Sequence, residues 1–573
     1  MTVLSLSEGK SGLEQVLDKE TLSKILRFSV KREEIERKFV ISNLPNGLDS
    51  YEKEEIEQFY IPVQGQSEVR IRSASGRYFI TEKSGTGIKR NETEAEISKE
   101  TFQSLKSKAV SSLRKTRYII PPDNENKIEL NVYKDNLNGL NVAEIEFDSM
   151  GAAEVLKQKD WFSFEVTYDK RYSNYSLAVD GKPSEIKLKD GINLSKNKID
   201  LAIASSNKPV VVLIAGGSGS GKTSFANELK AEFGEKAIIM SLDDYYYGPK
   251  YIDELSKSGA KINFDQPESV DLDRAASDLE KLLAGGSINK TIYDFSDGPY
   301  KYETIVPHDI IIVEGLFALN QKLEKYGDLK IFIDTSKHDR LIRKLLRDLE
   351  RTTWPSTRIL GYTIETVEPM YEKYVEPTKT NSDLIINSNY NPEIESKRAK
   401  VLDRQVKFRI SGAQLDYHEK LRKLGAELLF KTKQTDTYYN ARMADITCRD
   451  EIVRIRREPN RLLWTYKGPK KQGELFERRK LDIETYPNVE AGLSQIYREL
   501  KQIKKTRFTY RLNDSVFALD FGVKVKSGGK TSELGDFLEF RLSNSDNIFS
   551  NLNNLKTAFG ITGEMITSSY FEI

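Results

Sequence analysis

The sequence predicts a multidomain α+β and α/β chain in which two antiparallel β-barrels flank a domain with a parallel sheet. Two patterns predict this arrangement. Between about residues 32 and 180, and again after about residue 401, short strands carry charged residues two apart, whereas 209–391 alternates apolar strands with amphipathic helices. Side chains two apart share one face of a strand, and a continuous apolar strand is typical of a parallel sheet covered on both faces. The 573 residues have room for about three or four domains.

The two barrel segments repeat each other. VRIR occurs at 69–72 and again at 453–456, and T-x-K occurs at 81–83 and again at 465–467. The shared order and near-constant offset indicate an internal repeat. We expect a helical leader over 1–31, the first barrel over 32–180, a polar linker over 181–208, the parallel domain over 209–391, a connector over 392–400 and the second barrel over 401–573.

Composition excludes several classes of function. Lys and Arg number 89 against 87 Asp and Glu, so no overall field recruits nucleic acid or anionic lipid. A single cysteine, Cys448, excludes an intramolecular disulfide and a multi-cysteine zinc site. The N-terminus lacks the apolar segment of a signal peptide, and no stretch approaches about 18 uninterrupted apolar residues. We expect a cytoplasmic protein without nucleic-acid or membrane partners, and the sequence leaves the oligomeric state open.

A glycine-rich loop opens the central domain. The segment GGSGSGKTS follows the apolar strand VVVLIA and precedes a helical stretch. In such a loop the backbone N–H groups wrap phosphates, Lys222 reaches the β- and γ-phosphates and Thr223 binds Mg²⁺. We therefore expect ATP at this loop. The expected nucleotide-binding residues are Gly216, Gly217, Ser218, Gly219, Ser220, Gly221, Lys222, Thr223 and Ser224.

Residues 209–391 resemble the uridine kinase and phosphoribulokinase branch of P-loop kinases, through GGSGSGKTS, SLDDYY, NFDQPESVD, DIIIVEGLFAL and RLIRKLLRD. The resemblance implies that Asp243 is the general base on an acceptor hydroxyl and that Asp265 binds the acceptor. It also implies that Glu314 supports the metal. Two arginines of the expected lid over the phosphates, Arg343 and Arg347, complete the set.

The central domain also departs from that family. Uridine kinases carry a histidine and a nearby arginine that help to hold the nucleoside, and this chain has Gly298 and Tyr300 at those places. The second arginine cluster of the lid is replaced by TTWPST. The resemblance therefore supports ATP binding more than uridine phosphorylation, and a regulatory nucleotide-binding module without turnover is the alternative.

The first barrel combines cations with carboxylates. The cations can neutralise phosphate oxygens and stabilise charge on a leaving pyrophosphate. The carboxylates supply oxygen ligands for Mg²⁺ or Mn²⁺, whose bound water is the expected nucleophile. The expected triphosphate-binding residues are Lys38, Arg70, Arg72, Lys83, Lys115, Arg117 and Arg171. The expected metal ligands are Glu34, Glu36, Glu94, Glu96, Glu129, Glu144 and Glu146, with Thr223 and Glu314 in the central domain.

Residues 32–180 resemble a CYTH domain of the triphosphate tunnel metalloenzyme family. The E-x-E-x-K signature is complete in Glu34, Glu36 and Lys38. Members of the bacterial branch hydrolyse inorganic triphosphate, and relatives act on thiamine triphosphate or cyclise ATP. The resemblance implies a metal-dependent triphosphatase with Glu34, Glu36, Lys38 and Lys83 in the catalytic site. Asn131, where relatives often have an acid, predicts one weaker metal ligand.

Residues 401–573 resemble the same family more faintly. The basic positions persist as Lys407, Arg454, Arg456, Lys467, Lys505 and Arg507. Asp403 and Gln405 stand where the leading glutamates would be, and Arg541 follows Glu539. With fewer metal ligands, this barrel is expected to bind polyphosphate without efficient hydrolysis. Metal binding stays open through Asp482, Glu484, Asp520 and Glu539.

Together these patterns predict a metal-dependent hydrolase of inorganic triphosphate or a related polyphosphate, fused to an ATP-binding kinase-like module that can phosphorylate a small acceptor. Three alternatives stay open. One is a small-molecule or nucleoside kinase whose barrels sense polyphosphate, a second is a class IV-type adenylate cyclase acting on a nucleoside triphosphate, and the third is a nucleotide-gated scaffold without turnover.

Overall fold

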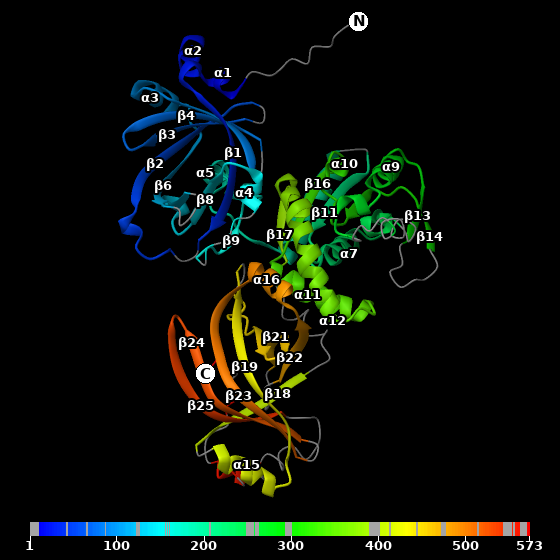
Figure 1. Cartoon of the computed structure of the whole chain (residues 1–573). Coiled ribbons are helices and arrows are strands. Elements are labelled where there is room, and N and C mark those ends of the chain that lie inside the picture. Colours follow the sequence, from blue (N-terminus) through cyan, green and yellow to red (C-terminus); the bar gives the residue numbers. More distant parts are fainter. Residues whose placement is uncertain are drawn as a thin grey trace.

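A computed structural model covers the chain (Figure 1). It describes residues 11–41, 44–64, 67–85, 88–121, 127–154, 161–205, 208–247, 263–292, 301–388, 402–411, 414–442, 445–471, 477–512 and 515–541, together with 156, 159, 257, 553, 556–557, 559–561, 566 and 570–572.

The first barrel is closed by antiparallel strands in the order β5-β4-β3-β2-β6-β7-β8-β1, and β1 pairs back to β5. Its apolar side chains face outward, where Ile71 and Ile80 pack against Phe102 of a covering helix. Its helices are α1 (Gly12–Val16), α2 (Lys19–Phe28), α3 (Lys99–Lys106), α4 (Met150–Glu154) and α5 (Asn174–Asp180). Its strands are β1 (Val30–Val40), β2 (Glu52–Ile61), β3 (Glu68–Ala74), β4 (Arg77–Ser84), β5 (Lys89–Glu96), β6 (Ser111–Ile120), β7 (Ile128–Tyr133) and β8 (Asn141–Phe147), with β9 (Phe164–Glu165) beside β1.

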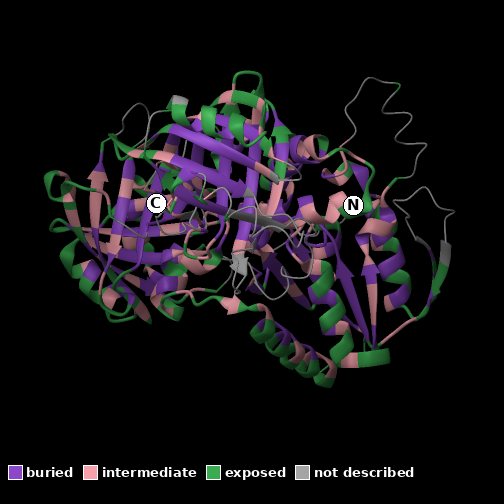
Figure 2. Cartoon of the chain, turned by 90° about the horizontal axis from the view of Figure 1, so that it is seen from below, coloured by how far each residue is buried: buried purple, intermediate pink, exposed green. Residues whose placement is uncertain are grey.

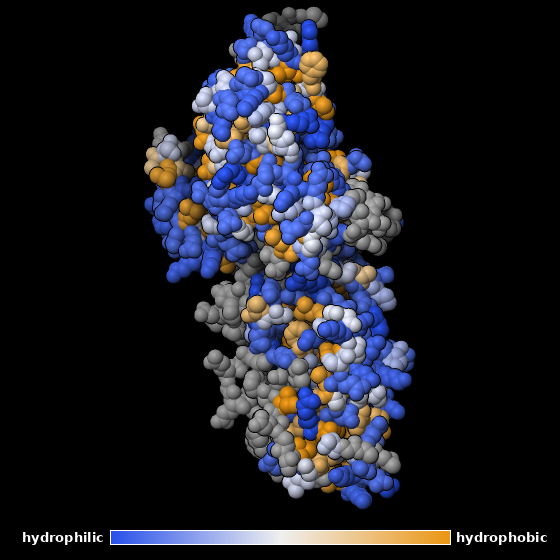
Figure 3. All heavy atoms as spheres, turned by 90° about the vertical axis from the view of Figure 1, so that its left-hand side faces the viewer, coloured by the Kyte–Doolittle hydropathy of each residue, from blue (hydrophilic) through white to orange (hydrophobic). Residues whose placement is uncertain are grey.

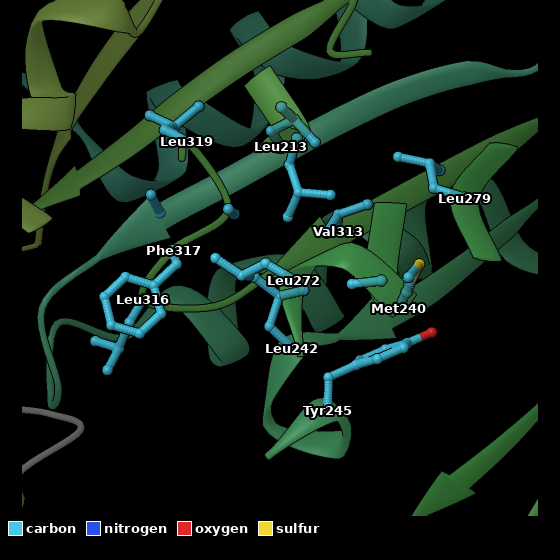
Figure 4. Packing of buried hydrophobic residues seen from close by; sticks show 14 of the residues in the cluster. Leu213, Met240, Leu242, Tyr245, Leu272, Leu279, Val313, Leu316, Phe317 and Leu319 are labelled. Atoms are coloured by element: carbon cyan, nitrogen blue, oxygen red, sulfur yellow. The ribbon is translucent and has the colours of Figure 1, made fainter. Parts of the chain in front are cut away.

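The central domain has a parallel sheet in the order β10-β17-β16-β11-β15-β12. Buried side chains fill both faces, and Figure 4 shows one face, where Leu213 and Val313 of neighbouring strands lie near Leu272 and Leu279. The strands are β10 (Ile186–Lys187), β11 (Val210–Gly216), β12 (Ala237–Ser241), β15 (Ile310–Glu314), β16 (Leu329–Asp334) and β17 (Leu384–Asn387), beside a separate hairpin of β13 (Ile288–Ile292) and β14 (Lys301–Ile305).

Among the helices of the central domain, α11 lies over the glycine-rich loop and α12 packs against the second barrel. The helices in the described part of this domain are α6 (Leu188–Ser205), α7 (Lys222–Phe233), α9 (Leu272–Leu283), α10 (Gln321–Glu324), α11 (Lys337–Arg351), α12 (Ser356–Tyr362) and α13 (Glu368–Met370). They are accompanied by the π-helical turns η7 (Thr363–Val367) and η8 (Tyr371–Val375) and the 3₁₀ segment η9 (Glu376–Asn381).

The predicted linker over 181–208 was wrong in its middle part. The segment contains β10, which extends the parallel sheet, and the helix α6. Ile192 and Ile199, seven residues apart, lie on one face of α6 and pack into the core beneath the sheet. Gly191 permits this close packing, because a Cβ there would lie 2.8 Å from Cδ1 of Ile386. Of the polar residues that suggested a linker, Asn193, Asn197 and Lys198 lie on the exposed face of this helix, whereas Ser195 is buried.

The second barrel repeats the topology of the first. Its strand order is β18-β22-β21-β20-β19-β23-β24-β25, which matches the first barrel strand for strand and confirms the internal repeat. The strands are β18 (Leu402–Ile410), β19 (Glu427–Ala441), β20 (Ile452–Glu458), β21 (Arg461–Lys471), β22 (Glu477–Thr485), β23 (Tyr497–Leu512), β24 (Ser515–Ser527) and β25 (Lys530–Arg541), with helices α15 (Gln414–Lys423) and α16 (Pro487–Ile496).

The central domain and the second barrel share one buried apolar cluster. It joins Leu341 and Leu345 of α11 to Trp464 and Ile483 of the barrel, and Figure 1 shows α16 beside α11. Buried residues concentrate in the strands (Figure 2), and polar side chains dominate the face seen in Figure 3. No helix in the described ranges is both long and apolar enough to cross a membrane.

Candidate functional sites

The glycine-rich loop joins β11 to α7 in a tightly packed turn. Gly216 has φ +155°, and a Cβ there would lie 2.6 Å from the carbonyl oxygen of Ile333 and 2.7 Å from Oγ of Ser220. Gly219 has φ +79°, and its Cβ would lie 2.7 Å from the carbonyl oxygen of Arg340. Larger residues would therefore open the turn. The loop ends at the N-terminus of α7, where backbone N–H groups are positioned to bind phosphate.

Glu314, at the end of β15, collects the polar groups beside this loop. One carboxylate oxygen accepts a hydrogen bond from Oγ1 of Thr223 at 3.2 Å, and the other accepts one from Oγ of Ser241 at 2.8 Å. Burial raises the pKa of Glu314, with Asp243 adding to the increase and Lys222 opposing it. The carboxyl ends of parallel strands thus bring the predicted base, lysine, threonine and acid to one edge of the sheet.

The two arginines of the expected lid lie over the loop. Nη2 of Arg347 is 3.4 Å from Oγ of Ser218. Nη1 of Arg343 is 3.2 Å from Oγ of Ser388 and 3.5 Å from the carbonyl oxygen of Ser220. Both guanidinium groups are therefore within reach of a phosphate chain held by the loop.

Asp265, the predicted acceptor-binding residue, is buried and has a partner that the sequence did not reveal. The hydroxyl of Tyr362, at the end of α12, donates to Oδ2 of Asp265 at 3.2 Å and accepts from the N–H of Phe264 at 3.3 Å. Burial raises the pKa of Asp265. Gly298 and Tyr300, which replace the nucleoside-binding residues of uridine kinases, lie outside the described residues.

Glu144 is the centre of the ionic interior of the first barrel. It accepts hydrogen bonds from Nζ of Lys38 at 2.7 Å, from Nδ2 of Asn131 at 2.9 Å and from Nη2 of Arg117 at 3.1 Å. Nζ of Lys38 also lies 3.3 Å from Glu36. Burial raises the pKa of Glu144, but Lys38 and other nearby cations outweigh it and hold the pKa well below its usual range. The carboxylate is therefore ionised within a ring of cations.

A second group of charges lies beside it. Nζ of Lys83 is 2.7 Å from carboxylate oxygens of both Glu34 and Glu92, and Arg90 pairs with Glu36. Burial raises the pKa of Glu92, but Lys83 and a neighbouring arginine outweigh it and lower the pKa to about 2. Arg90 and Glu92 were not among the predicted site residues. They continue the alternation of charges along β5, so the same spacing could have found them.

Several cationic groups in this interior have donors without a protein acceptor. The Nε atoms of Arg70, Arg72 and Arg90 are buried and have no hydrogen-bond partner among the described residues. Lys115 is fully buried and donates a long hydrogen bond, 3.3 Å, to Oδ1 of Asn174, and burial lowers its pKa. Unsatisfied buried donors are costly, so this arrangement fits an anionic ligand.

The carboxylates of this interior are paired with cations. Among the described residues, no group of three or more His, Cys, Asp or Glu side chains is arranged to hold a metal. Glu34, Glu36 and Glu144 are nevertheless buried oxygen donors of the kind that Mg²⁺ and Mn²⁺ prefer. A metal bound together with a polyphosphate fits both the cations and the carboxylates of this interior. The anion can pair with the lysines and arginines that now neutralise the carboxylates, and the carboxylates can then bind the metal.

The remaining predicted carboxylates differ in position. Glu94 pairs with Arg72 at 3.2 Å, and Glu129 pairs with Arg117, so both belong to the interior. The third, Glu96, is exposed and pairs with an arginine on the outside at 2.7 Å.

Glu146 and Arg171 are more exposed than the central charges. The Glu146 side chain is half exposed, and burial raises its pKa. Arg171 makes two hydrogen bonds to Asp169, at 2.9 and 2.7 Å, and a third to the carbonyl oxygen of Ser184, beside the central domain. In contrast, Asn174 at the start of α5 reaches the interior, and sequence spacing gave no signal for it.

The second barrel has a cavity with an excess of cations. Strand register places Lys480 where the first barrel has Glu92, because Lys480 pairs with Lys467 as Glu92 pairs with Lys83. By the same register Asp520 replaces Asn131. Burial lowers the pKa of Lys505 to about 7. The charged residues lining the cavity are Lys407, Arg454, Arg456, Lys467, Lys480, Lys505, Arg507 and Glu539.

Not every expected residue of the second barrel can be placed in this cavity. Strand register puts Asp403, Gln405 and Arg541 on β18 and β25 as expected, but their side chains are outside the described set. Glu484 lies on β22 with an exposed side chain. Asp482, on the same strand, accepts a hydrogen bond from the cavity residue Thr465 at 2.7 Å and pairs with Lys480 at 2.5 Å. Asp520 and Glu539 are buried and share the guanidinium of Arg507. The described carboxylates of this interior are thus already held by arginine or lysine.

The fold and these sites define a nucleotide-binding domain of the P-loop kinase class between two barrels with ionic interiors. The chain belongs to the phosphoribulokinase / uridine kinase family, whose model matches residues 211–395, and the CYTH domain model matches 32–173 and 405–548. The uridine kinase of Bacillus pumilus is 39% identical over 183 residues, which are 31% of this chain and 87% of that protein. The uridine kinase of Lactiplantibacillus plantarum is 34% identical over 190 residues, 33% of this chain and 90% of that protein.

A crystal structure of an inorganic triphosphatase resembles one part of the chain at 34% identity. The match covers 26% of this chain and 94% of that one, with a TM-score of 0.22.

Proposed function

We propose that the first barrel hydrolyses inorganic triphosphate or a related polyphosphate, and that the central domain binds ATP and phosphorylates a small acceptor. The observation that carries the first part is the buried interior in which unpaired guanidinium donors of Arg70, Arg72 and Arg90 lie among ionised glutamates. An anion of high charge satisfies these donors, and carboxylates then need a divalent cation in place of the lost lysine and arginine partners.

Each group of side chains has a distinct task in this proposal. Lys38, Lys83 and Arg117 hold phosphate oxygens and stabilise the charge that develops on the leaving group. Glu34 and Glu36 hold the metal, which supplies charge neutralisation and an activated water when bound. The strands keep these side chains fixed, so the site works by position and charge rather than by a covalent intermediate.

Phosphate release from triphosphate tests this proposal. The full-length protein should release phosphate only with added Mg²⁺ or Mn²⁺, and Glu34→Gln/Glu36→Gln should lose at least about 100-fold in turnover, as expected when electrostatic groups of an active site are removed. Glu57→Gln, on the exposed side of β2, is the matched control. Undiminished turnover by the double variant would refute the assignment.

The kinase part is tested by resolving products. ATP is incubated with a panel of nucleosides and sugar phosphates, and the products are separated as phosphorylated acceptor, cyclic AMP or phosphate. Acceptor phosphorylation that disappears in Asp243→Asn supports the kinase. Cyclic AMP would favour the cyclase alternative, and ATP binding without any product would favour the scaffold.

The cavity of the second barrel favours a second function, polyphosphate binding without efficient hydrolysis. Its lining has a lysine, Lys480, where the first barrel has a carboxylate, and Nε of Arg454 is buried without a partner among the described residues. Calorimetry with triphosphate in chelator should show an anion site that weakens with salt and is lost in Arg454→Gln. Retention of all binding in that variant would contradict it.

A further inference from the structure

The central domain and the second barrel meet in a tightly packed seam. Ile359 and Leu360 of α12 and Ile364 of η7 belong to the same buried cluster as Val453 and Ile455 of β20. These side chains are between 0 and 6% exposed. Displacement of one buried side chain in such a cluster is therefore expected to displace the side chains packed against it.

Two glycines, one on each side of the seam, permit the close approach. A Cβ on Gly361 of α12 would lie 2.4 Å from the hydroxyl oxygen of Tyr486, at the start of α16. A Cβ on Gly492 of α16 would lie 2.2 Å from Cγ2 of Ile364. Neither glycine has positive φ, so space rather than backbone conformation favours glycine at both positions. At Gly361 the nearest atom is the end of the Tyr486 side chain, which is 37% exposed.

Polar contacts also determine the orientation of the central domain relative to the second barrel at this seam. Oγ1 of Thr357 in α12 donates to the carbonyl oxygen of Glu484 at 2.9 Å. Nη1 of Arg449 from the barrel is 2.9 Å from Oδ1 of Asp339 in the first turn of α11. Both helices of the central domain are therefore attached to the second barrel.

The residue after Gly361 reaches the acceptor side of the kinase site. Tyr362 donates to Asp265 at 3.2 Å and accepts from the N–H of Phe264 at 3.3 Å. Its ring lies edge-on to that of Trp354, with 5.8 Å between the centroids. The position of Tyr362 is thus set on one side by the helix that rests on the barrel and on the other by the segment that carries Asp265.

We propose that the second barrel supports the acceptor side of the kinase site, with Tyr486 setting the position of α12 and Tyr362 acting as a positioning residue for Asp265. This inference rests on the proposed kinase function for its consequence, but not for its geometry. The second barrel then has a structural role in the kinase site, in addition to any role in ligand binding.

Hydrogen exchange of the full-length protein tests the geometry without an acceptor. Gly361→Ala should displace α12 and speed exchange of the Phe264 amide, because the hydroxyl of Tyr362 moves away from it. Tyr486→Phe removes the oxygen that the new methyl group meets, and the next atom, Cζ, is 3.4 Å away. Gly361→Ala/Tyr486→Phe should therefore restore slow exchange.

Two control variants distinguish this local effect from a general loss of stability. Gly151→Ala adds a methyl group that has no atom within 4 Å and should change nothing. Tyr362→Phe keeps the ring and removes the hydroxyl, so it should speed exchange at Phe264 while the α12 amides stay protected. Unchanged exchange at Phe264 in Gly361→Ala, or failure of Tyr486→Phe to restore it, would overturn the proposal.

The activity arm uses whichever acceptor the product screen identifies. Gly361→Ala and Tyr362→Phe should raise the KM for that acceptor by about three- to tenfold, the range of one hydrogen bond, with the KM for ATP unchanged. Equal effects on both substrates would contradict a role on the acceptor side. If the wild type phosphorylates no acceptor, the kinase function fails, while the exchange experiment still decides the role of the seam.

Discussion

Glu144→Gln should destabilise the first barrel strongly, because it removes one negative charge from a buried ring of cations. The carboxylate has Lys38 at 2.7 Å and Arg117 at 3.1 Å. Removal of one partner of a buried ion pair costs about 3–5 kcal/mol. Lys38 keeps Glu36 at 3.3 Å and Arg117 keeps Glu129, so the lower end of that range, about 3 kcal/mol, is expected. For a domain of about 150 residues this lowers Tm by roughly 6–12 °C.

Scanning calorimetry of the full-length protein measures this change as a shift of one transition. Because the cations hold the folded-state pKa of Glu144 well below its unfolded value of about 4.3, its contribution is present above that pH and is lost as the pH falls through the folded pKa. The difference between wild type and variant should therefore shrink in acid. Glu96→Gln, which removes an exposed carboxylate paired with Arg77, is the control and should not shift the transition. A Glu144→Gln protein that melts with the wild type would refute the idea that cations hold this carboxylate.

Three other outcomes are expected. Lys222→Ala should abolish ATP binding, measured by calorimetry, and leave triphosphate hydrolysis, measured by phosphate release, within a few fold of the wild type. Loss of both activities would show that the two sites are not independent. Sulfate, whose charge is constant near neutral pH, should bind the second barrel more weakly as the pH rises above the pKa of Lys505 of about 7, since the cation is lost, and Lys505→Met should remove that dependence. Burial, together with the nearby charge of Glu165, raises the pKa of Glu376 to about 7. Ionisation of Glu376 therefore destabilises the fold as the pH rises from its unfolded-state pKa to about 7. Glu376→Gln should raise Tm at about pH 8 and not at about pH 4, and equal shifts at both pH values would contradict this.

Alternation of charges was the part of the sequence that predicted most about the barrels. It placed Glu34, Glu36 and Lys38 on one strand face, and the recurrence of VRIR predicted the shared topology that the strand order confirms. Local periodicity determines which face a side chain occupies, so these features could be predicted without knowledge of distant contacts. The glycine-rich loop was predictable for the same reason, since its strand, turn and helix are consecutive.

Features that depend on contacts between distant segments could not be predicted. Helix α6 was missed because the apolar residues of its buried face, among them Leu188, Ile192 and Ile199, are separated by glycine, serine, asparagine and lysine residues. The partner of Asp265 is Tyr362, almost a hundred residues later, and no motif joins them. The pairing of each carboxylate in the interior of the first barrel with a cation was also not predicted. Sequence spacing shows which side chains share a face of a strand but not which of them are in contact.

The two faces of strand β20 have different functions. Arg454 and Arg456 line the cavity of the second barrel, while Val453 and Ile455 pack against the helices of the central domain. Insertion or deletion of a single residue within this strand would exchange the two sets, presenting arginine to the apolar seam and valine to the anion cavity. Changes of length in this strand therefore damage two domains at once, so the second barrel can be replaced only by a domain that keeps both its register and its outer surface.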